Sequence, residues 1–428
     1  SEVQKFMTVA TKEGIWMKGA PEVVLAKVRL TQKEKNMWEK KIALYASEGL
    51  RVLALARDST FLGIIGIADP VREGVADAVK ELTAAGIAVK IVTGDYRGTA
   101  EAIAKSIGLP ITDPSRQIIE GKELAAMTSQ ELSGRISDVL LFCRVIPMDK
   151  LKIVTVLQAR GDVVAMTGDG VNDAAAIKKA DIGIVVADAS DVAKEIADVV
   201  LVDSNIQTIA AAVEEGRGIF ENIRKVVFYL VSGSFVEICI ITISIVLGLP
   251  LPLTALQILW INLVNDGLPA LALTLDPTRR GLMREQPRTK STPIVDGRIA
   301  TLVMFVSLST TILVITAFLW ALGSGRDLAY AQTLVFTMVA FVTLIYVFSY
   351  RRMHARLTLV SVFRNHWLIV AVAISIALQL FAVYHPWGND AFGTIGLGSM
   401  EWVIVIGASL SMLGMIEGTK AFFLRKTV

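Results

Sequence analysis

Six long apolar segments in the second half of the chain constrain its fold more than any other feature of the sequence. Each is close to the ~20 residues that an α-helix needs to cross a bilayer. One such segment could be a buried helix of a soluble protein, but six in succession predict a bundle of six transmembrane helices. The segments are residues 226–247, 253–275, 299–322, 328–350, 367–384 and 400–424.

The charges of the connecting loops predict how these spans are oriented. Six Lys and Arg residues lie between the second and third spans and four between the fourth and fifth, whereas the other three loops contain one in total. Loops rich in Lys and Arg stay on the cytoplasmic side. We therefore expect a multi-pass protein of the plasma membrane. Its cytoplasmic parts are the residues before the first span, both basic loops and the C-terminus.

The residues before the first span have the composition of a soluble α/β protein, although 53% of the whole chain is hydrophobic. The formal net charge of +3 gives no reason to expect a nucleic-acid partner. The two cysteines lie in separate regions, which fits a reduced, cytosol-facing protein. The chain begins without Met in a pattern typical of a hairpin, so we expect it to be a piece of a longer polypeptide.

Apolar strands alternate with helical segments between residues 61 and 220. This alternation predicts an α/β domain with a doubly wound parallel sheet, whose ligands bind at the carboxyl ends of the strands. The expected strands are residues 62–68, 88–92, 139–144 and 163–166, and the expected helices are residues 71–85, 99–107 and 147–159.

Three groups of polar residues follow the expected strands. A hydroxyl group and a lysine can contact phosphoryl oxygens, and carboxylates after a strand can hold Mg²⁺. Each group alone is typical of a surface turn, but their order along the chain predicts one site for a phosphoryl group. Its members are Thr93, Gly94, Asp95, Lys150, Asp169, Asn172 and Asp173.

The first two spans carry polar side chains that a simple membrane anchor does not need. Ser234 and Glu237 are spaced i, i+3, and Asn262, Asn265 and Asp266 are spaced i, i+3, i+4, so each set lies on one face of an α-helix. A carboxylate at the bilayer centre costs about 2.5–3.5 kcal/mol on insertion scales. Interhelical hydrogen bonding is the alternative explanation, and it accounts poorly for two carboxylates. These oxygens predict a site for a hard cation such as Ca²⁺.

Longer motifs now identify a family resemblance. The soluble part resembles the haloacid-dehalogenase-like fold. The chain from Lys18 onward resembles the carboxyl-terminal half of a type-II P-type cation-transporting ATPase, of the calcium-pump-like branch. The soluble motifs are KGAPE, GLRVLALA, DPVREGV, IVTGDYRGTA, FCRVIPMDKLKIV and TGDGVND, and the membrane motifs are YLVSGSFVE and LQILWINLVNDGLPALAL.

The resemblance implies roles for individual residues. It implies that Lys18 lines the adenine pocket of an ATP site and that Arg51 reaches the ATP phosphates. It implies that Asp169 binds Mg²⁺, with Asp173 as a second candidate ligand. The implied phosphoryl site contains Thr93, Gly94, Asp95, Lys150, Asn172 and Asp173, and the implied ligands of the transported cation are Ser234, Glu237, Asn262, Asn265 and Asp266.

The resemblance also implies three domains. Residues 1–68 correspond to the carboxyl-terminal part of a nucleotide-binding domain. Residues 69–220 correspond to the carboxyl-terminal part of a phosphorylation domain with the haloacid-dehalogenase-like fold. Residues 221–428 correspond to a transmembrane domain that contains helices five to ten of the family.

Several departures from the family pattern leave the transported cation open. Ser234 stands where calcium pumps usually have asparagine, and Asn265 stands where they often have threonine. Tyr96 replaces an asparagine of the TGD motif, and residues 341–348 lack the carboxylate that some calcium pumps place there. Ca²⁺ is the first choice because two carboxylates and amide oxygens suit it, and Na⁺, Mn²⁺ and H⁺ are the alternatives.

The sequence contains no DKTGT motif, whose aspartate these pumps phosphorylate. We therefore expect the chain to be inactive alone and to depend on the missing amino-terminal half of the same pump. The leading interpretation is the carboxyl-terminal part of an ATPase that moves a cation across the lipid bilayer. The alternatives are a membrane-anchored phosphohydrolase and an inactive or split fragment that binds only nucleotide or a partner.

Overall fold

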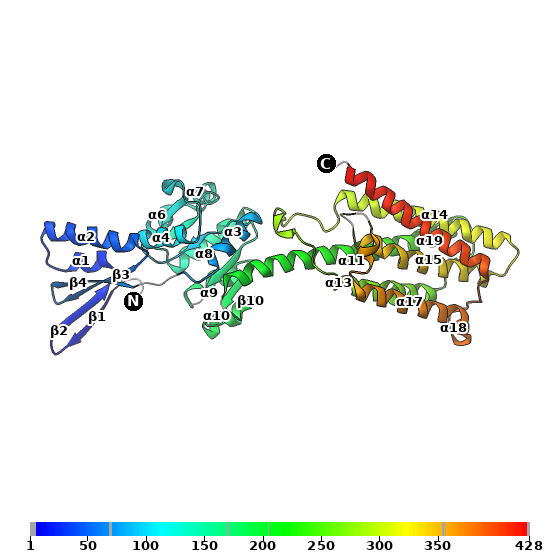
Figure 1. The fold of residues 1–428 in the computed structure, drawn as a ribbon, viewed down its shortest axis with the longest axis horizontal. Helices are drawn as coiled ribbons and strands as arrows, with labels where there is room; N and C mark the ends of the chain where they lie inside the picture. Colours follow the sequence, from blue (N-terminus) through cyan, green and yellow to red (C-terminus); the bar gives the residue numbers. More distant parts are fainter. Residues whose placement is uncertain are drawn as a thin grey trace. The chain divides into compact units, whose positions relative to one another are not determined.

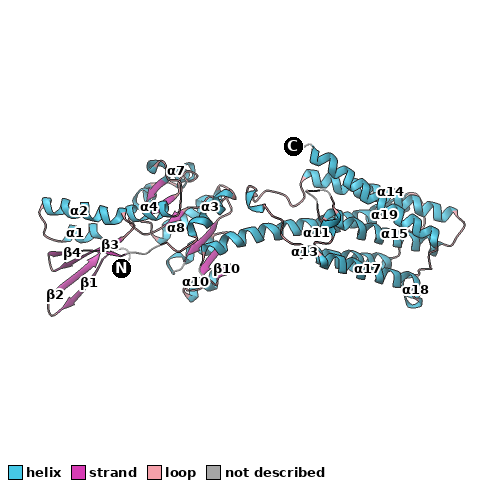
Figure 2. Cartoon of the chain, in the orientation of Figure 1, coloured by secondary structure: helices cyan, strands magenta, loops and turns pink. Residues whose placement is uncertain are grey.

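The computed structural model describes residues 6–67, 71–168, 171–203, 205–352, 355 and 357–425. The chain divides into two compact units (Figure 1). The first unit comprises residues 1–214 and 281–291, and the second comprises residues 215–280 and 292–428. The first contains all the described strands, and the second is helical (Figure 2).

A four-stranded antiparallel sheet opens the first unit, with strands β1 (Phe6–Thr11), β2 (Gly14–Gly19), β3 (Arg51–Arg57) and β4 (Thr60–Ile67) in sequence order. Helices α1 (Pro21–Lys27) and α2 (Gln32–Ser47) connect β2 to β3. Residues 62–68 were expected in the parallel sheet, but β4 pairs antiparallel with β3. A two-residue turn that includes Asp58, at φ +55°, makes β3 and β4 a hairpin, so β4 belongs to this sheet.

The remaining strands of the first unit pair only in parallel, which confirms the α/β class. They form two three-stranded sheets, ordered β5-β7-β6 and β10-β9-β8, whereas the sequence predicted one. The short strand β5 and the strand β8 are edge strands of these two sheets. The strands are β5 (Ile91–Val92), β6 (Ile118–Glu120), β7 (Leu141–Cys143), β8 (Ala165–Gly168), β9 (Ile182–Val186) and β10 (Val199–Leu201).

Helices connect these strands and cover them. The helix expected at residues 147–159 is α8 (Pro147–Ala159), with proline in its first turn, where no backbone N–H is needed. Ile119, Leu124 and Phe142 are fully buried and form a core with α8. The other helical segments are α3 (Val75–Ala84), α4 (Arg97–Ser106), α5 (Pro114–Gln117), α6 (Gly121–Ala126), α7 (Ser129–Arg135), η1 (Val171–Asp173), α9 (Ala174–Lys179) and α10 (Asp191–Ile196).

The described residues contain six helices that are long and apolar enough to cross a membrane, as the sequence predicted. The second of them is composite: α12 (Ala255–Trp260) continues through the π-helix η2 (Ile261–Asp266) into α13 (Gly267–Thr274). The others are α11 (Ile206–Val246), α14 (Gly297–Gly323), α15 (Leu328–Tyr350), α17 (His366–Tyr384) and α19 (Ser399–Arg425). Short helices η3 (Leu282–Arg284), α16 (Leu359–Val362) and α18 (Pro386–Phe392) lie in the loops.

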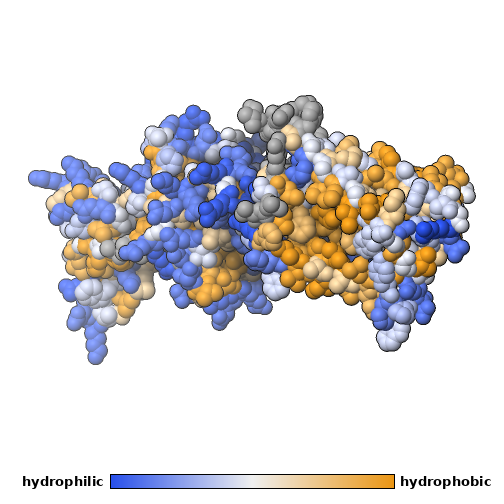
Figure 3. Space-filling model, turned by 45° about the vertical axis from the view of Figure 1, so that its right-hand side comes forward, coloured by the Kyte–Doolittle hydropathy of each residue, from blue (hydrophilic) through white to orange (hydrophobic). Residues whose placement is uncertain are grey.

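The helical unit is apolar on its surface as well as in its core. Its surface is mainly hydrophobic in Figure 3, and Leu263, Leu271 and Val403 are each about two-thirds exposed. Helix α15 is buried along almost its whole length, so the other spans pack around it. Exposed apolar residues at this density need an apolar solvent, and the chain is therefore an integral membrane protein.

Candidate functional site

The Thr93-Gly94-Asp95 turn follows β5 directly and is held by its own side chains. The Thr93 hydroxyl donates to the Asp95 carboxylate at 2.8 Å and accepts from the Asp95 N–H at 3.1 Å. The Thr93 carbonyl accepts from the backbone N–H of Val145, which follows β7. The turn and the loop before α8 therefore meet at the carboxyl ends of two neighbouring parallel strands, as the sequence predicted.

Lys150 and Asp173 form an ion pair that connects the first turn of α8 to the turn after β8. Both side chains are largely buried, at 14% and 11% exposure. A Cβ atom on Gly168 would lie 2.6 Å from Asp173 Oδ2, so only glycine leaves room for this carboxylate. Asn172, which lies between Gly168 and Asp173 in the sequence, is in η1 and exposed. The structure thus brings together two of the predicted phosphoryl-site residues with opposite charges.

Two predicted residues fall partly or wholly outside the described structure. Asp169, the expected Mg²⁺ ligand, is not among the described residues, and neither is the side chain of Arg51. Lys18 is exposed on β2 and pairs in register with Leu55 of β3, while Arg51 begins β3. Lys18 and Arg51 are therefore on adjacent strands of the antiparallel sheet.

An ion pair that the sequence did not predict connects this sheet region to the predicted phosphoryl site. Glu22, the last residue of the KGAPE motif, pairs with Arg144 at the end of β7. The Arg144 guanidinium also lies over the Tyr96 ring, 4.9 Å from its centroid. Arg144 has a left-handed backbone at φ +56°, unusual for a residue that is not glycine. The two partners are 122 positions apart, so no local pattern could have revealed them.

Burial shifts the pKa values of two groups near the parallel strands. It raises the pKa of the Cys143 thiol to about 11, because the thiol lies at the end of the buried strand β7. It lowers the pKa of the Lys90 ammonium to about 8. Lys90 Nζ donates to the carbonyls of Ile136 and Val139 at 2.7 and 2.5 Å. The Asp162 and Asp138 carboxylates raise the pKa of Lys90, but burial outweighs them.

In the membrane unit, α11 and the π-helix bring the predicted acidic and amide groups together. Asn262 Nδ2 donates to both carboxylate oxygens of Glu237, at 3.1 and 2.8 Å, and Glu237 is only 6% exposed. Asp266, 2% exposed, accepts a hydrogen bond from the Tyr229 hydroxyl at 3.1 Å. A Cβ atom on Gly233 would lie 2.7 Å from Asp266 Oδ2, so glycine makes space for this carboxylate.

The third predicted residue of the second span faces a different helix. Asn265 Nδ2 donates to Gln379 Oε1 on α17 at 2.9 Å, and the Trp260 indole N–H donates to the same oxygen at 3.1 Å. The i, i+3, i+4 spacing predicted one shared α-helical face, but a π-helix turns less per residue and separates Asn265 from Asn262. Ser234 is half-buried and makes no side-chain hydrogen bond with the part of the chain that the structure describes.

Polar atoms without partners remain in this cluster. Among the described residues, Asn265 Oδ1, Gln379 Nε2 and the Tyr346 hydroxyl are buried and lack a hydrogen-bond partner. Such an orphan costs roughly 1–3 kcal/mol unless a ligand or water satisfies it. The described residues contain no group of three or more His, Cys, Asp and Glu side chains that could hold a metal ion. A cation here therefore needs amide and hydroxyl oxygens beside the two carboxylates.

Two further residues of this cluster, Tyr229 and Gln379, were not predicted, although the sequence pattern marks both. Tyr229 precedes Gly233 and Glu237 by four and eight residues, so it lies on the same face of α11. Gln379 is a lone amide in an otherwise apolar span, and polar residues at that depth are usually functional.

Comparisons with known proteins identify related families for both parts of the chain. A family model described as "Cation transporting ATPase, C-terminus" matches residues 250–422, and models described as "haloacid dehalogenase-like hydrolase" match residues 2–181 and 151–213. The chain is 38% identical to a calcium-transporting ATPase of Bacillus subtilis (strain 168), covering 97% of the chain and 50% of that protein. It is 36% identical to the human calcium-transporting ATPase type 2C member 1, covering 94% and 45% respectively. The chain thus spans about half the length of the curated relatives it matches.

Proposed function

The chain is homologous to the carboxyl-terminal half of P-type cation-transporting ATPases of the calcium-pump branch, and from this premise we propose that it carries the cation-binding site of an ATP-driven pump. The observation that carries the proposal is the buried cluster of Glu237, Asn262 and Asp266 on two adjacent spans. Two carboxylates inside a membrane are costly, and they persist where they bind something.

We propose Ca²⁺ as the transported cation. Ca²⁺ takes six to eight oxygen ligands in flexible geometry, and carboxylate and amide oxygens are typical among them. Glu237 and Asp266 offer four carboxylate oxygens, and the unpartnered Asn265 Oδ1 offers an amide oxygen. To accept a cation, Glu237 would exchange its contact with the Asn262 amide N–H for the ion. Ser234 could add a hydroxyl oxygen to the site.

In the soluble unit, we propose that Thr93, Lys150 and Asp173 surround a phosphoryl group. The Lys150–Asp173 pair would open so that the ammonium offsets phosphoryl charge and the carboxylate faces a cation. Bound Mg²⁺ would supply further charge neutralisation, with Asp169 and Asp173 as its protein ligands. Gly168 supports this role of Asp173, because a Cβ atom there would lie 2.6 Å from Asp173 Oδ2. Lys18 and Arg51 would contact ATP from the antiparallel sheet.

The phosphorylated aspartate is proposed to lie in the other half of the whole protein, since this sequence holds no DKTGT motif. Helix α11 runs without interruption from Ile206 to Val246 and contains Glu237. We propose that this helix carries the consequence of phosphorylation to the cation site. The soluble unit, both basic loops and the C-terminus would face the cytoplasm, and the plasma membrane is the proposed location.

Terbium luminescence in detergent tests the cation site on this chain directly. Tb³⁺ replaces Ca²⁺ at oxygen sites and is excited through a nearby indole, and Trp260 hydrogen-bonds within the cluster. We expect sensitised emission that Ca²⁺ suppresses by competition. Glu237→Gln and Asp266→Asn should each weaken Tb³⁺ binding at least tenfold, or about 1.4 kcal/mol.

The matched control is Glu401→Gln. Glu401 is a buried carboxylate of another span, and it accepts a hydrogen bond from Tyr330 rather than facing the cluster. It should leave the Tb³⁺ affinity unchanged. If both variants, Glu237→Gln and Asp266→Asn, bind Tb³⁺ with the affinity of the unaltered chain, the proposed cation site is refuted. That result would favour the alternative hypothesis, a membrane-anchored phosphohydrolase.

A further inference from the structure

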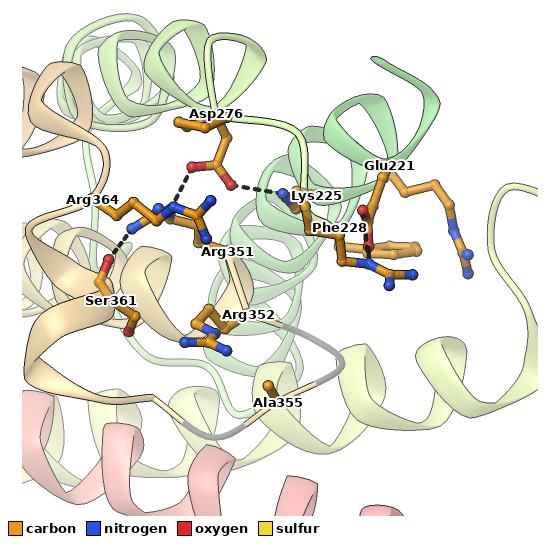
Figure 4. A pocket seen from close by; sticks show the side chains of 12 residues that line it. Glu221, Lys225, Phe228, Asp276, Arg351, Arg352, Ala355, Ser361 and Arg364 are labelled. Atoms are coloured by element: carbon orange, nitrogen blue, oxygen red, sulfur yellow. Dashed lines mark hydrogen bonds and ion pairs between the residues drawn. The ribbon is translucent and has the colours of Figure 1, made fainter. Parts of the chain in front are cut away.

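A polar cavity lies within the membrane unit, apart from the proposed cation site at Glu237, Asn262 and Asp266. It has a volume of about 110 Å³, enough for several water molecules or one tetrahedral anion. Its walls come from α11, from the segment after α13, from the end of α15 and from the α15–α17 loop (Figure 4). Figure 4 shows Asp276, Lys225, Arg352 and Ser361 placed around one hollow.

The cavity carries a large excess of positive charge. Six of its lining residues are cations and two are carboxylates. Two of the cations, Lys225 and Arg351, share the Asp276 carboxylate, whose single negative charge balances one of them. Glu221 pairs with Arg279 at 2.9 Å. The lining cations are Arg224, Lys225, Arg279, Arg351, Arg352 and Arg364.

Internal pairing does not balance this charge. Arg224 forms an ion pair with Asp296, at 2.7 Å, and Asp296 does not line the cavity. Counting Asp296, three carboxylates face six cations, so three positive charges remain. Arg352 and Arg364 account for two of them, since neither side chain has a hydrogen bond or ion pair with any described residue. Clustered cations without counter-charge repel one another, and an anion between them removes that penalty.

Guanidinium groups select the kind of anion. Arginine presents a planar fork of N–H donors that matches phosphate oxygens in bidentate geometry. Arg352 is half-buried and Arg364 is exposed, so the cavity has an inner and an outer free arginine. The side-chain donors of Arg352 and Arg364 contact no acceptor among the described residues, whereas those of Arg351 bond to Asp276 and the Ser361 carbonyl.

The cavity also lies beside the ends of two spans, where a bilayer would place its lipid headgroups. Arg351 and Arg352 follow directly after the span α15, and Arg364 lies two residues before the span α17 begins. Next to Arg364, Phe363 and Trp367 are 62% and 65% exposed. Exposed aromatic residues at the end of a span are typical of the membrane–water interface. Basic pockets between spans at that interface bind anionic headgroups.

We propose that this cavity binds a phosphate group presented by an anionic lipid headgroup, with Arg352 and Arg364 as its principal contacts. The bound phosphate would join the α15–α17 loop to α11 through the charges that both segments contribute. This inference is independent of the proposed transport, because it rests on cations that the cation cluster does not use.

The test uses the complete chain in nanodiscs of four parts phosphatidylcholine to one part phosphatidylglycerol. After extraction, native mass spectrometry counts the phosphatidylglycerol that remains bound. The test variant is Arg352→Gln with Arg364→Gln, and the control is Arg280→Gln with Arg284→Gln, which removes two arginines of the basic loop that do not line the cavity. The test variant should lose roughly 30-fold in affinity for phosphatidylglycerol, about 2 kcal/mol for two arginines.

Three comparisons decide the outcome. The control variant should bind phosphatidylglycerol about tenfold more tightly than the test variant does. Both variants should have the thermal unfolding midpoint of the unaltered chain, since neither arginine of the test pair makes a described contact that stabilises the fold. Inorganic phosphate added at millimolar concentration should not displace the lipid. Displacement by inorganic phosphate would overturn the lipid as the source of the phosphate group, and equal retention of phosphatidylglycerol by both variants would overturn the site.

Discussion

Replacing Asp276 with asparagine would remove the carboxylate that two buried cations, Lys225 and Arg351, share. Asp276 is 7% exposed, and Lys225 and Arg351 are 8% and 7% exposed. Lys225 Nζ lies 2.7 Å from Asp276 Oδ2, while Arg351 Nε donates to Oδ1. Asparagine keeps the size of the side chain but has one acceptor oxygen where aspartate has two, and both Asp276 oxygens accept hydrogen bonds. The substitution therefore removes the negative charge and one acceptor at nearly constant volume.

The expected cost follows from this geometry. At 2.7 Å and an effective dielectric constant of about 20, the Lys225 pair alone is worth about 6 kcal/mol of attraction. Part of this is returned, because the variant no longer desolvates a carboxylate. Breaking a buried pair by removing one partner typically costs about 3–5 kcal/mol, and we expect Asp276→Asn to lower the free energy of unfolding by that amount.

Unfolding of the complete chain by sodium dodecyl sulfate in mixed micelles, followed by helicity, measures the difference. Asp296→Asn is the matched control, because Asp296 pairs with Arg224 but its side chain is 45% exposed, and it should cost no more than about 1 kcal/mol. Adding Lys225→Gln to Asp276→Asn should recover part of the loss, since it removes one stranded cation.

Two results would refute this reasoning. If Asp276→Asn costs no more than Asp296→Asn, burial does not strengthen the pairs at Asp276. The second result concerns the double variant. If Lys225→Gln lowers the free energy of unfolding as much in the Asp276→Asn background as it does alone, Lys225 does not interact with the carboxylate and the shared-charge argument is wrong.

Three further predictions concern other parts of the chain. Gly233→Ala should crowd Asp266 Oδ2, weaken Tb³⁺ binding and cost about 1–3 kcal/mol of stability; unchanged affinity would contradict it. Lys90, with its pKa lowered to about 8 from 10.5, binds fewer protons folded than unfolded between those pH values, so stability should rise with pH there. Acetylation rates against pH should show half-maximal reactivity of Lys90 near pH 8, and a midpoint near 10.5 would exclude the shift. Cys143, whose pKa burial raises to about 11, should react with maleimide at pH 8 only after unfolding, as mass spectrometry of labelled peptides can show.

The sequence predicted those features that short-range patterns determine. Each of the six spans follows from an apolar run of the right length, and α8 begins at Pro147 as predicted. The helix start is marked locally, because Pro147 needs no hydrogen-bond donor and the Asp149 carboxylate accepts from the Ile146 N–H at 3.0 Å. Positions after strands likewise predicted that the TGD turn and the loop before α8 would meet.

Features that depend on pairing between distant segments were not predictable in this way. The hydrophobic pattern of residues 62–68 is the same whether the strand joins a parallel or an antiparallel sheet, and the turn at Asp58 decided it. The Glu22–Arg144 ion pair and the excess charge beside Asp276 combine residues from segments that are far apart in the sequence. The roles assigned to Asp169 and Arg51 stay predictions.

The π-helix at Ile261–Asp266 rotates the faces of α12 and α13 relative to each other about the axis of their common span. Hydrogen bonds that close over five residues instead of four accommodate one residue more than an α-helix, which corresponds to a rotation of about 100°. Deleting Leu263 would let the span close as an α-helix, shorter by only about 1.5 Å, and would turn Asp266 away from Tyr229. The shortened chain should still insert and fold yet lose Tb³⁺ binding, and retained binding would contradict this. The one extra residue of the π-helix therefore determines which neighbouring helix each side-chain oxygen of this span faces.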